Sequence, residues 1–183
     1  MYKKLALSAI IAMTANVALA GEFTLTSKDI KEGEMMSKAQ EFQGFGCEGG
    51  NASPQLSWSG APEGTKSFAL TVHDRDAPTG SGWWHWQVIN IPADTTSLAT
   101  NAGAAENGKL PEGSAQTRND YGYKGFGGLC PPPGHGVHHY TFTIHALKVE
   151  KLEIPEDASA ALAGYMINGN SLGSASIEAL YER

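Results

Sequence analysis

The sequence predicts a mainly β domain: a β-sandwich of two antiparallel sheets, Greek-key-like in its connections, with a few short helices. Apolar residues come in short alternating runs separated by Gly, Pro, Asn and Asp, which is typical of all-β sandwiches and barrels. Helical patterns are confined to two short segments near the C-terminus. Residues 21–183 have the length of one ordinary domain, and we expect a single domain over that range.

Residues 1–20 have the pattern of a cleavable signal peptide. A lysine pair precedes an apolar run from Leu5 to Val17, and Ala18-Leu19-Ala20 supplies small residues at a cleavage position. The alternative is a membrane anchor, but the run is too short to cross about 30 Å of hydrocarbon comfortably. We therefore expect cleavage after Ala20 and a periplasmic location, with further secretion left open.

The chain is acidic. It has 13 basic and 19 acidic residues, for a formal charge of −6. The first 20 residues hold two of the lysines and no acidic residue, so the remainder carries 11 basic and 19 acidic side chains, a formal charge of −8. This balance argues against sequence-independent nucleic-acid binding and against attachment to anionic lipid by charge. We expect no nucleic-acid partner and no stable membrane anchoring.

Two cysteines, Cys47 and Cys130, lie in the part of the chain expected to be exported. In an oxidising compartment a lone pair usually forms a disulfide, and the alternative is two free thiols. A CxxC motif is absent from the sequence, so a thioredoxin-like redox role has no support.

Alternation predicts which side chains face the core. The expected strands are 23–27, 55–58, 67–74, 83–91 and 137–147. Within 67–74 the parity turns Asp74 inward. The run 83–91 is apolar on both faces and is predicted to be buried on both sides. In 137–147 the parity places His138 and Tyr140 at the rim of the core and His139 toward water. Helices are expected at 157–163 and 174–180, and the Gly- and Pro-rich excursion 100–135 has the character of a functional loop.

Three polar segments are candidates for chemistry. In 73–78 the inward Asp74 requires a partner because an unpaired buried charge is costly, whereas Asp76 is equally compatible with a simple turn. In 83–86 His85 stands among three tryptophans; the alternative is a core histidine with its hydrogen bonds satisfied. In 131–140 a proline-stiffened loop could present backbone N–H groups to an anion.

These residues resemble the two signature regions of the phosphatidylethanolamine-binding protein family, which includes the Raf kinase inhibitor proteins and a bacterial branch. The resemblance rests on an ordered set of motifs: Asp74-Arg75-Asp76-Ala77-Pro78, Trp84-His85, and Pro131-Pro132 followed by Gly136, His138 and Tyr140. The bacterial branch is further indicated by Gly49-x-Asn51-x-Ser53-Pro54-x-Leu56-x-Trp58, by Pro78 to Trp86 and by Ser174-Ala175-Ser176.

The resemblance implies a two-sheet sandwich with a small pocket at one end that accepts phosphate-like or carboxylate groups, including phospholipid head groups. Carried over position by position, the ligand-binding residues are Asp74, Pro78, Trp84, His85, Pro131, Pro132, Gly136, His138 and Tyr140. It also implies a cis Ala77–Pro78 bond. Two positions depart from the family pattern: Cys130 stands where Gly or Ala is common, so a bond to Cys47 could pin this loop, and His139 stands where Arg is frequent.

We expect His85 and His138 to donate hydrogen bonds to a small compact anion, with Asp74 orienting a ring. The predicted function is an exported binding or regulatory protein with a small anion pocket, modulating an unidentified partner protein. One alternative is a hydrolase or other acid–base enzyme using His85, His138 and Asp74; another is an interaction protein with a vestigial pocket. Because no HExxH or GxSxG motif is present, we expect no catalytic residue, metal or cofactor. A homodimer is left open.

Overall fold

The computed structural model describes residues 21–183, and the predicted signal peptide, residues 1–20, lies outside the described residues. In chain order the elements are β1 (Thr24–Thr26), β2 (Gln43–Gly44), β3 (Cys47–Glu48), β4 (Leu56–Ser59), β5 (Ser67–Asp74), β6 (Trp83–Pro92), β7 (Ser97–Leu98), β8 (Ala115–Gln116), β9 (His138–Leu147), α1 (Ala160–Asn170) and β10 (Ser171–Tyr181). The described part of the chain is therefore mainly β, with one α-helix where the sequence predicted a few short ones.

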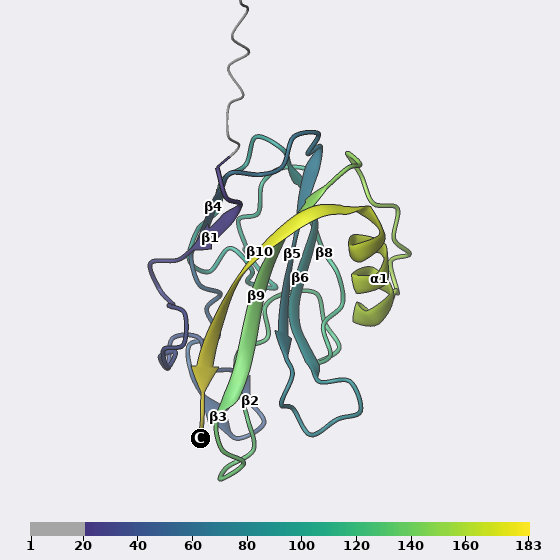
Figure 1. The fold of residues 1–183 in the computed structure, drawn as a ribbon. Helices are drawn as coiled ribbons and strands as arrows, with labels where there is room; N and C mark the ends of the chain where they lie inside the picture. The colour runs from purple at the N-terminus through teal and green to yellow at the C-terminus, as the bar shows by residue number, and fades with distance from the viewer. Residues whose placement is uncertain (1–20) are drawn as a thin grey trace, which may run out of the picture.

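The central sheet has five antiparallel strands in the order β10-β9-β5-β6-β8. A second sheet has the order β1-β4-β7, and β2 and β3 form a small hairpin. Figure 1 shows β1 and β4 on one side of the central sheet and α1 on the other. This arrangement confirms the predicted sandwich of antiparallel sheets.

The main core fills the space between the two sheets. Alternate residues of the central strands point into it, as the parity predicted, and meet residues of β1, β4 and β7; its members include Leu25, Leu56, Trp58, Leu70, Val72, Trp86, Val88, Leu98, Phe142 and Ile144. A smaller cluster lies on the opposite face, where Ile167 of α1 packs with Ala69, Ile89 and Leu147. The central sheet is thus covered on both faces.

Strand β6 contains two register irregularities. Val72 pairs with Trp86 and His73 with Trp84, so β6 has one more residue than β5 at this point. Such a bulge changes which face the following side chains occupy. As a result both Trp86 and its neighbour His85 are buried, and Trp83 lies opposite Asp74.

Two predictions about local structure were wrong. Residues 174–180 are not helical but form most of β10, which pairs with β9 along its whole length and buries Ile177 and Ala179. Pairing with β9 outweighs the weak helical preference of this Ser- and Ala-rich segment. The helix expected at 157–163 begins later, at Ala160, because the Ser159 side chain accepts a hydrogen bond from the Leu162 N–H and caps it.

The Ala77–Pro78 bond is also not in the predicted form, because residues 21–183 contain no cis peptide bond. The turn after β5 is closed instead by the Asp76 N–H donating to Asp74 Oδ1 and the Thr79 N–H donating to the Ala77 carbonyl. A trans bond is the intrinsically preferred form, and this turn accommodates it.

Within residues 21–183, no helix combines the length and the apolar character needed to cross a membrane.

Candidate functional site

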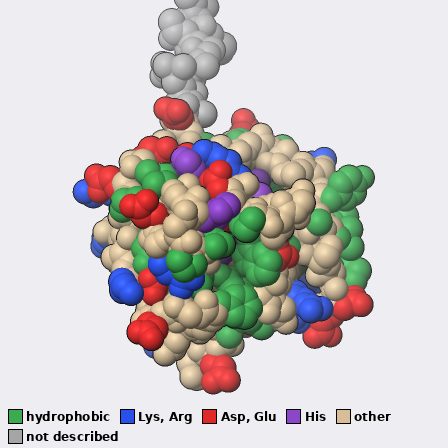
Figure 2. Space-filling view, turned by 90° about the horizontal axis from the view of Figure 1, so that it is seen from below, with side chains coloured by type: hydrophobic (Ala, Val, Ile, Leu, Met, Phe, Trp, Pro, Cys, Tyr) green, Lys and Arg blue, Asp and Glu red, His purple; other side chains and the backbone are tan. Residues whose placement is uncertain are grey.

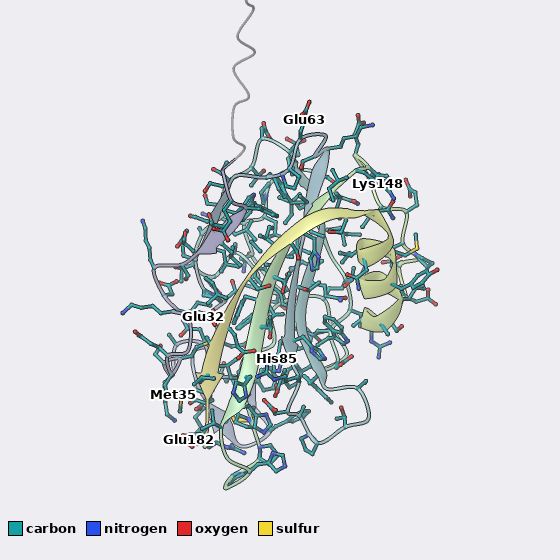
Figure 3. All side chains as sticks on the ribbon, in the orientation of Figure 1. Glu32, Met35, Glu63, His85, Lys148 and Glu182 are labelled. Atoms are coloured by element: carbon teal, nitrogen blue, oxygen red, sulfur yellow. A yellow bond between two sulfur atoms is a disulfide. The ribbon has the colours of Figure 1, made fainter. Side chains whose placement is uncertain are left out.

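A cavity of about 180 Å³ opens where β5 ends and β6 and β9 begin. Its lining consists of Phe45, Asp74, Ala77, Pro78, Thr79, Trp83, His85, Tyr121, Cys130, Pro131, Pro132, His138 and Tyr140. Figure 2 views this end of the molecule and shows hydrophobic side chains gathered on the face with histidines beside them. Figure 3 places His85 in the half of the molecule that also holds Glu182.

Seven of the nine residues predicted to bind a ligand line this cavity, and Trp84 and Gly136 do not. Trp84 lies on the other face of β6, where its ring is 4.3 Å from that of His73 and approaches Gly164 of α1. The bulge in β6 puts Trp83 on the cavity side in its place. Gly136 has a positive φ of 91° and serves the turn that leads into β9.

Asp74 is the acidic centre of the site. It is 3% exposed, in agreement with its predicted inward orientation. One carboxylate oxygen, Oδ1, accepts a hydrogen bond from the Asp76 N–H, and the other, Oδ2, lies 2.7 Å from His138 Nδ1. The buried carboxylate therefore fixes both the turn after β5 and the orientation of the His138 ring.

His138 joins a chain of three side chains. Its Nδ1 faces Asp74, and its Nε2 lies 2.8 Å from Nδ1 of His135, a residue of the proline-rich loop. Both ring nitrogens of this 1% exposed histidine are thus engaged within the protein. That His138 donates a hydrogen bond to a ligand stays a prediction, and in this structure both of its ring nitrogens face protein atoms.

His85 is held differently. Its Nδ1 lies 2.7 Å from the Gly127 carbonyl and 3.1 Å from the Gly128 carbonyl, in the loop between β8 and β9. Its Nε2 is buried and has no hydrogen-bond partner among the described residues. Burial lowers the pKa of His85, while the two carbonyls and Asp74 act in the opposite direction. The ring is therefore neutral near pH 7.

Three lining residues carry buried polar atoms without a partner in residues 21–183: Trp83 Nε1, His85 Nε2 and the Tyr140 hydroxyl. Buried polar groups are satisfied in the great majority of cases, so a group of three in one cavity requires an explanation. The Tyr140 ring lies 5.2 Å from that of His85, and burial together with the Asp74 charge raises the pKa of Tyr140; its hydroxyl lies near the Asp74 carboxylate but outside hydrogen-bond geometry. The hydroxyl therefore keeps its proton and is available as a donor.

A second Asp–His pair, Asp76 and His139, lies beside the cavity. Asp76 Oδ2 accepts hydrogen bonds from the His139 backbone N–H at 2.8 Å and from its ring Nδ1 at 2.7 Å. Partial burial raises the pKa of Asp76, but these bonds outweigh it and the net direction is down. His139 is about one-third exposed, so it faces water only in part, and its ring Nδ1 is directed to Asp76 rather than to the cavity.

A disulfide joins two walls of the cavity. Cys47 of the β2–β3 hairpin is bonded to Cys130, as predicted from the compartment and the cysteine count, with 6.0 Å between the Cα atoms. Arg183 adds to this wall by donating to the Pro131 carbonyl at 3.1 Å and to the Gly46 carbonyl at 2.6 Å. The hairpin and the proline-rich loop are thus fastened to each other at the mouth of the cavity.

The mouth of the cavity is aromatic, and the sequence pattern did not predict its residues. Phe45 is 72% exposed at the tip of the β2–β3 hairpin, and its ring lies 5.5 Å from that of Tyr121. Tyr121 also stacks on Phe42 at 4.1 Å and donates to the Gly128 carbonyl. Both aromatic residues come from loops without hydrophobic periodicity, so alternation could not place them. The sequence feature that could have located Phe45 at the mouth is its position two residues before Cys47.

Comparisons with known proteins agree with this fold. Residues 26–182 match the family model described as phosphatidylethanolamine-binding protein. The chain is 54% identical over 180 residues to the UPF0098 protein YbcL of Escherichia coli strain K12, covering 98% of each chain, and 46% identical over 157 residues to YbhB of the same strain, covering 86% of this chain and 98% of that one. The crystal structure of Escherichia coli YbcL, described as a new member of the mammalian PEBP family, superposes with a TM-score of 0.87 at 57% identity and covers 89% of this chain and 99% of that one. The chain belongs to the phosphatidylethanolamine-binding protein family.

Proposed function

We propose that this protein is an exported binding protein that holds a small oxyanion, phosphate-like or carboxylate, in the cavity at the end of β5 and thereby modulates a partner protein. The observation that carries the proposal is the group of unpartnered polar atoms in that cavity: Trp83 Nε1, His85 Nε2 and the Tyr140 hydroxyl. A ligand that hydrogen-bonds to them removes the cost of leaving buried polar groups unpaired.

The donors of the cavity favour an oxyanion. The Trp83 indole can only donate a hydrogen bond, and the Tyr140 hydroxyl, with its raised pKa, is a donor as well. The volume of about 180 Å³ is roughly that of six water molecules, which suits a head group rather than an acyl chain. The proposed ligand is therefore compact.

Binding is favoured over covalent catalysis by the chemistry of the lining. The sulfur of Cys130 is committed to the disulfide, and the Thr79 hydroxyl donates to the Gly82 carbonyl. The lining thus presents neither a free thiol nor a hydroxyl next to a histidine acceptor, apart from the tyrosines. The Asp74–His138 pair acts in this proposal to position the cavity wall.

Export is supported by the sequence of residues 1–20 alone. N-terminal sequencing of the protein recovered from a periplasmic fraction should begin at Gly21. Recovery of an uncleaved chain from the cytoplasm would contradict the exported location.

The binding proposal is tested by isothermal titration of phosphate and of phosphorylethanolamine into the purified protein. Both should bind at millimolar concentration or below, and Tyr140→Phe should weaken binding about tenfold because one donor is lost. Tyr165→Phe is the matched control, since Tyr165 is 75% exposed on α1 and should bind as the wild type does. An absence of heat and of chemical-shift change at His85 with millimolar ligand would sink the proposal.

A further inference from the structure

We propose that the cavity prefers oxyanions that still carry a hydroxyl group, such as the monoanion of a phosphomonoester, over oxyanions of the same charge and shape that lack one. In this proposal His85 accepts the hydrogen bond that the ligand hydroxyl donates. The inference rests on the proposed function and names the protonation state of its ligand. It follows from which ring nitrogen of His85 carries the proton.

The position of that proton is fixed by the loop carbonyls. His85 Nδ1 faces two carbonyl oxygens, of Gly127 at 2.7 Å and of Gly128 at 3.1 Å, and a carbonyl oxygen can only accept. Nδ1 must therefore carry a hydrogen. In the neutral ring Nε2 then has a lone pair and no hydrogen, so the atom left without a partner is an acceptor.

The surroundings keep the ring neutral. His85 is 2% exposed, and burial lowers its pKa. The titratable groups that face His85 are Asp74 from β5, Tyr140 from β9 and Tyr121 from the loop between β8 and β9. His73 lies on the far side of β5. Asp74 is the one carboxylate among them, and its Oδ1 and Oδ2 already hold the Asp76 N–H and His138.

The cavity therefore offers a mixed set of hydrogen-bonding groups. Trp83 Nε1 and the Tyr140 hydroxyl donate, while His85 Nε2 accepts. An oxyanion with a hydroxyl can satisfy all three, because its hydroxyl donates to Nε2 and its remaining oxygens accept. Sulfate and sulfate monoesters have acceptors alone, so they leave Nε2 unpaired and place lone pairs against it. Asp74 adds a further bias against ligands with a second negative charge.

Methyl phosphate and methyl sulfate form the matched pair that tests this inference. Near pH 5 both are monoanions of nearly equal shape, because the second pKa of a phosphomonoester is about 6, and they differ by one hydroxyl. Isothermal titration of the wild-type protein should give methyl phosphate an affinity at least about tenfold higher, the cost of one unpaired buried acceptor. As the pH rises through about 6, methyl phosphate should bind more weakly while methyl sulfate stays constant.

Variants separate the role of His85 from a merely structural one. His85→Phe removes the acceptor and should abolish the preference, and His85→Gln, which can supply an amide oxygen, should restore part of it. Tyr140→Phe removes a donor that both ligands use, so it should weaken both and leave their ratio unchanged. The ¹⁵N shifts of His85 should report a neutral ring with the hydrogen on Nδ1, with and without methyl phosphate.

The outcomes distinguish the two proposals. Equal affinities for the two ligands, or tighter binding of methyl sulfate, would overturn the selectivity and leave anion binding intact. An imidazolium signal from His85 in the methyl phosphate complex would overturn it as well, since the ring would then be a donor. If neither ligand binds, the proposed function itself fails. These readouts on wild-type protein hold even where His85→Phe does not fold.

Discussion

Two histidines, the buried His85 and the partly buried His145, lie on opposite faces of the central sheet and illustrate the difference between a site and a core. Burial lowers the pKa of both, in the case of His145 to about 4. His145 Nε2 lies 3.1 Å from the Thr71 hydroxyl, whereas His85 Nε2 has no partner among the described residues. A lowered pKa is therefore common to both faces. Single unpartnered buried atoms also occur elsewhere in residues 21–183, at Trp58 Nε1 and Ser114 Oγ, and the gathering of three in one lining is what marks the cavity.

Gln87, which also lies on the α1 face, shows the same difference in hydrogen bonding. Gln87 is fully buried there, and its amide donates to the Ala160 carbonyl while its oxygen accepts from the Thr117 hydroxyl at 2.9 Å. His145 and Gln87 thus have partners on this face, while Trp83, His85 and Tyr140 around the cavity leave one buried atom each without a partner in the described part of the chain. The comparison teaches that burial of polar groups locates candidates and that their hydrogen-bond balance separates binding from structure.

The largest expected effect comes from the crosslink at the cavity end. Changing both Cys47 and Cys130 to Ser should lower the free energy of unfolding by about 2–5 kcal/mol, because the bond closes a long loop, with a sequence separation of 83. Urea unfolding of the oxidised protein and the double variant measures this. A loss below about 1 kcal/mol would show that the remaining contacts, including the hydrogen bonds of Arg183, hold the hairpin and the proline-rich loop without the crosslink.

The next effect is the change in the free energy of unfolding with pH that His145 causes. Its pKa falls from about 6.5 in the unfolded chain to about 4 in the fold, so its contribution is complete above pH 6.5 and is lost as the pH falls toward 4. At pH 5 the loss should be about 1–2 kcal/mol. His145→Gln should flatten this part of the stability curve, measured by urea unfolding between pH 7.5 and about 4.5. An unchanged slope would contradict the assignment.

The smallest effect compares one hydroxyl from each region. Thr117→Val should cost about 1 kcal/mol, because it leaves the buried Gln87 oxygen without its donor. Tyr140→Phe should leave stability unchanged or raise it by up to about 1 kcal/mol, since its hydroxyl has no hydrogen-bond partner in residues 21–183. Thermal unfolding of the two variants without ligand checks this, and a larger loss in Tyr140→Phe would remove the contrast.

Strand parity predicted much of the fold and part of the site. Alternation in residues 67–74 and 137–147 placed Asp74, His138 and Tyr140 inward, and all three are buried. The reason is physical: the side-chain period of a strand is fixed, so a regular strand transmits orientation from the core to its end. The disulfide was predictable too, from a lone pair of cysteines in a part of the chain expected to be exported.

The parts that could not be predicted depend on irregular backbone or on tertiary pairing. The bulge in β6 places Trp83 rather than Trp84 at the cavity. Because residues 83–91 are apolar on both faces, their hydrophobic pattern does not show the extra residue. Residues 174–180 have apolar side chains at helical spacing, and their strand conformation comes from β9. Phe45 and Tyr121 reach the mouth from loops, and the contact of His135 with His138 likewise depends on a loop conformation.

The contacts of Arg183 have a practical consequence for anyone who produces this protein. Its side chain is hydrogen-bonded to the hairpin and to the proline-rich loop, and its carbonyl accepts a hydrogen bond from the Gly134 N–H. In Figure 1 this end lies beside β2 and β3, whereas β1 begins at the far end of the molecule. An affinity tag fused after Arg183 would thus emerge at the entrance and compete with ligands, while a tag inserted ahead of Glu22 would leave the entrance clear.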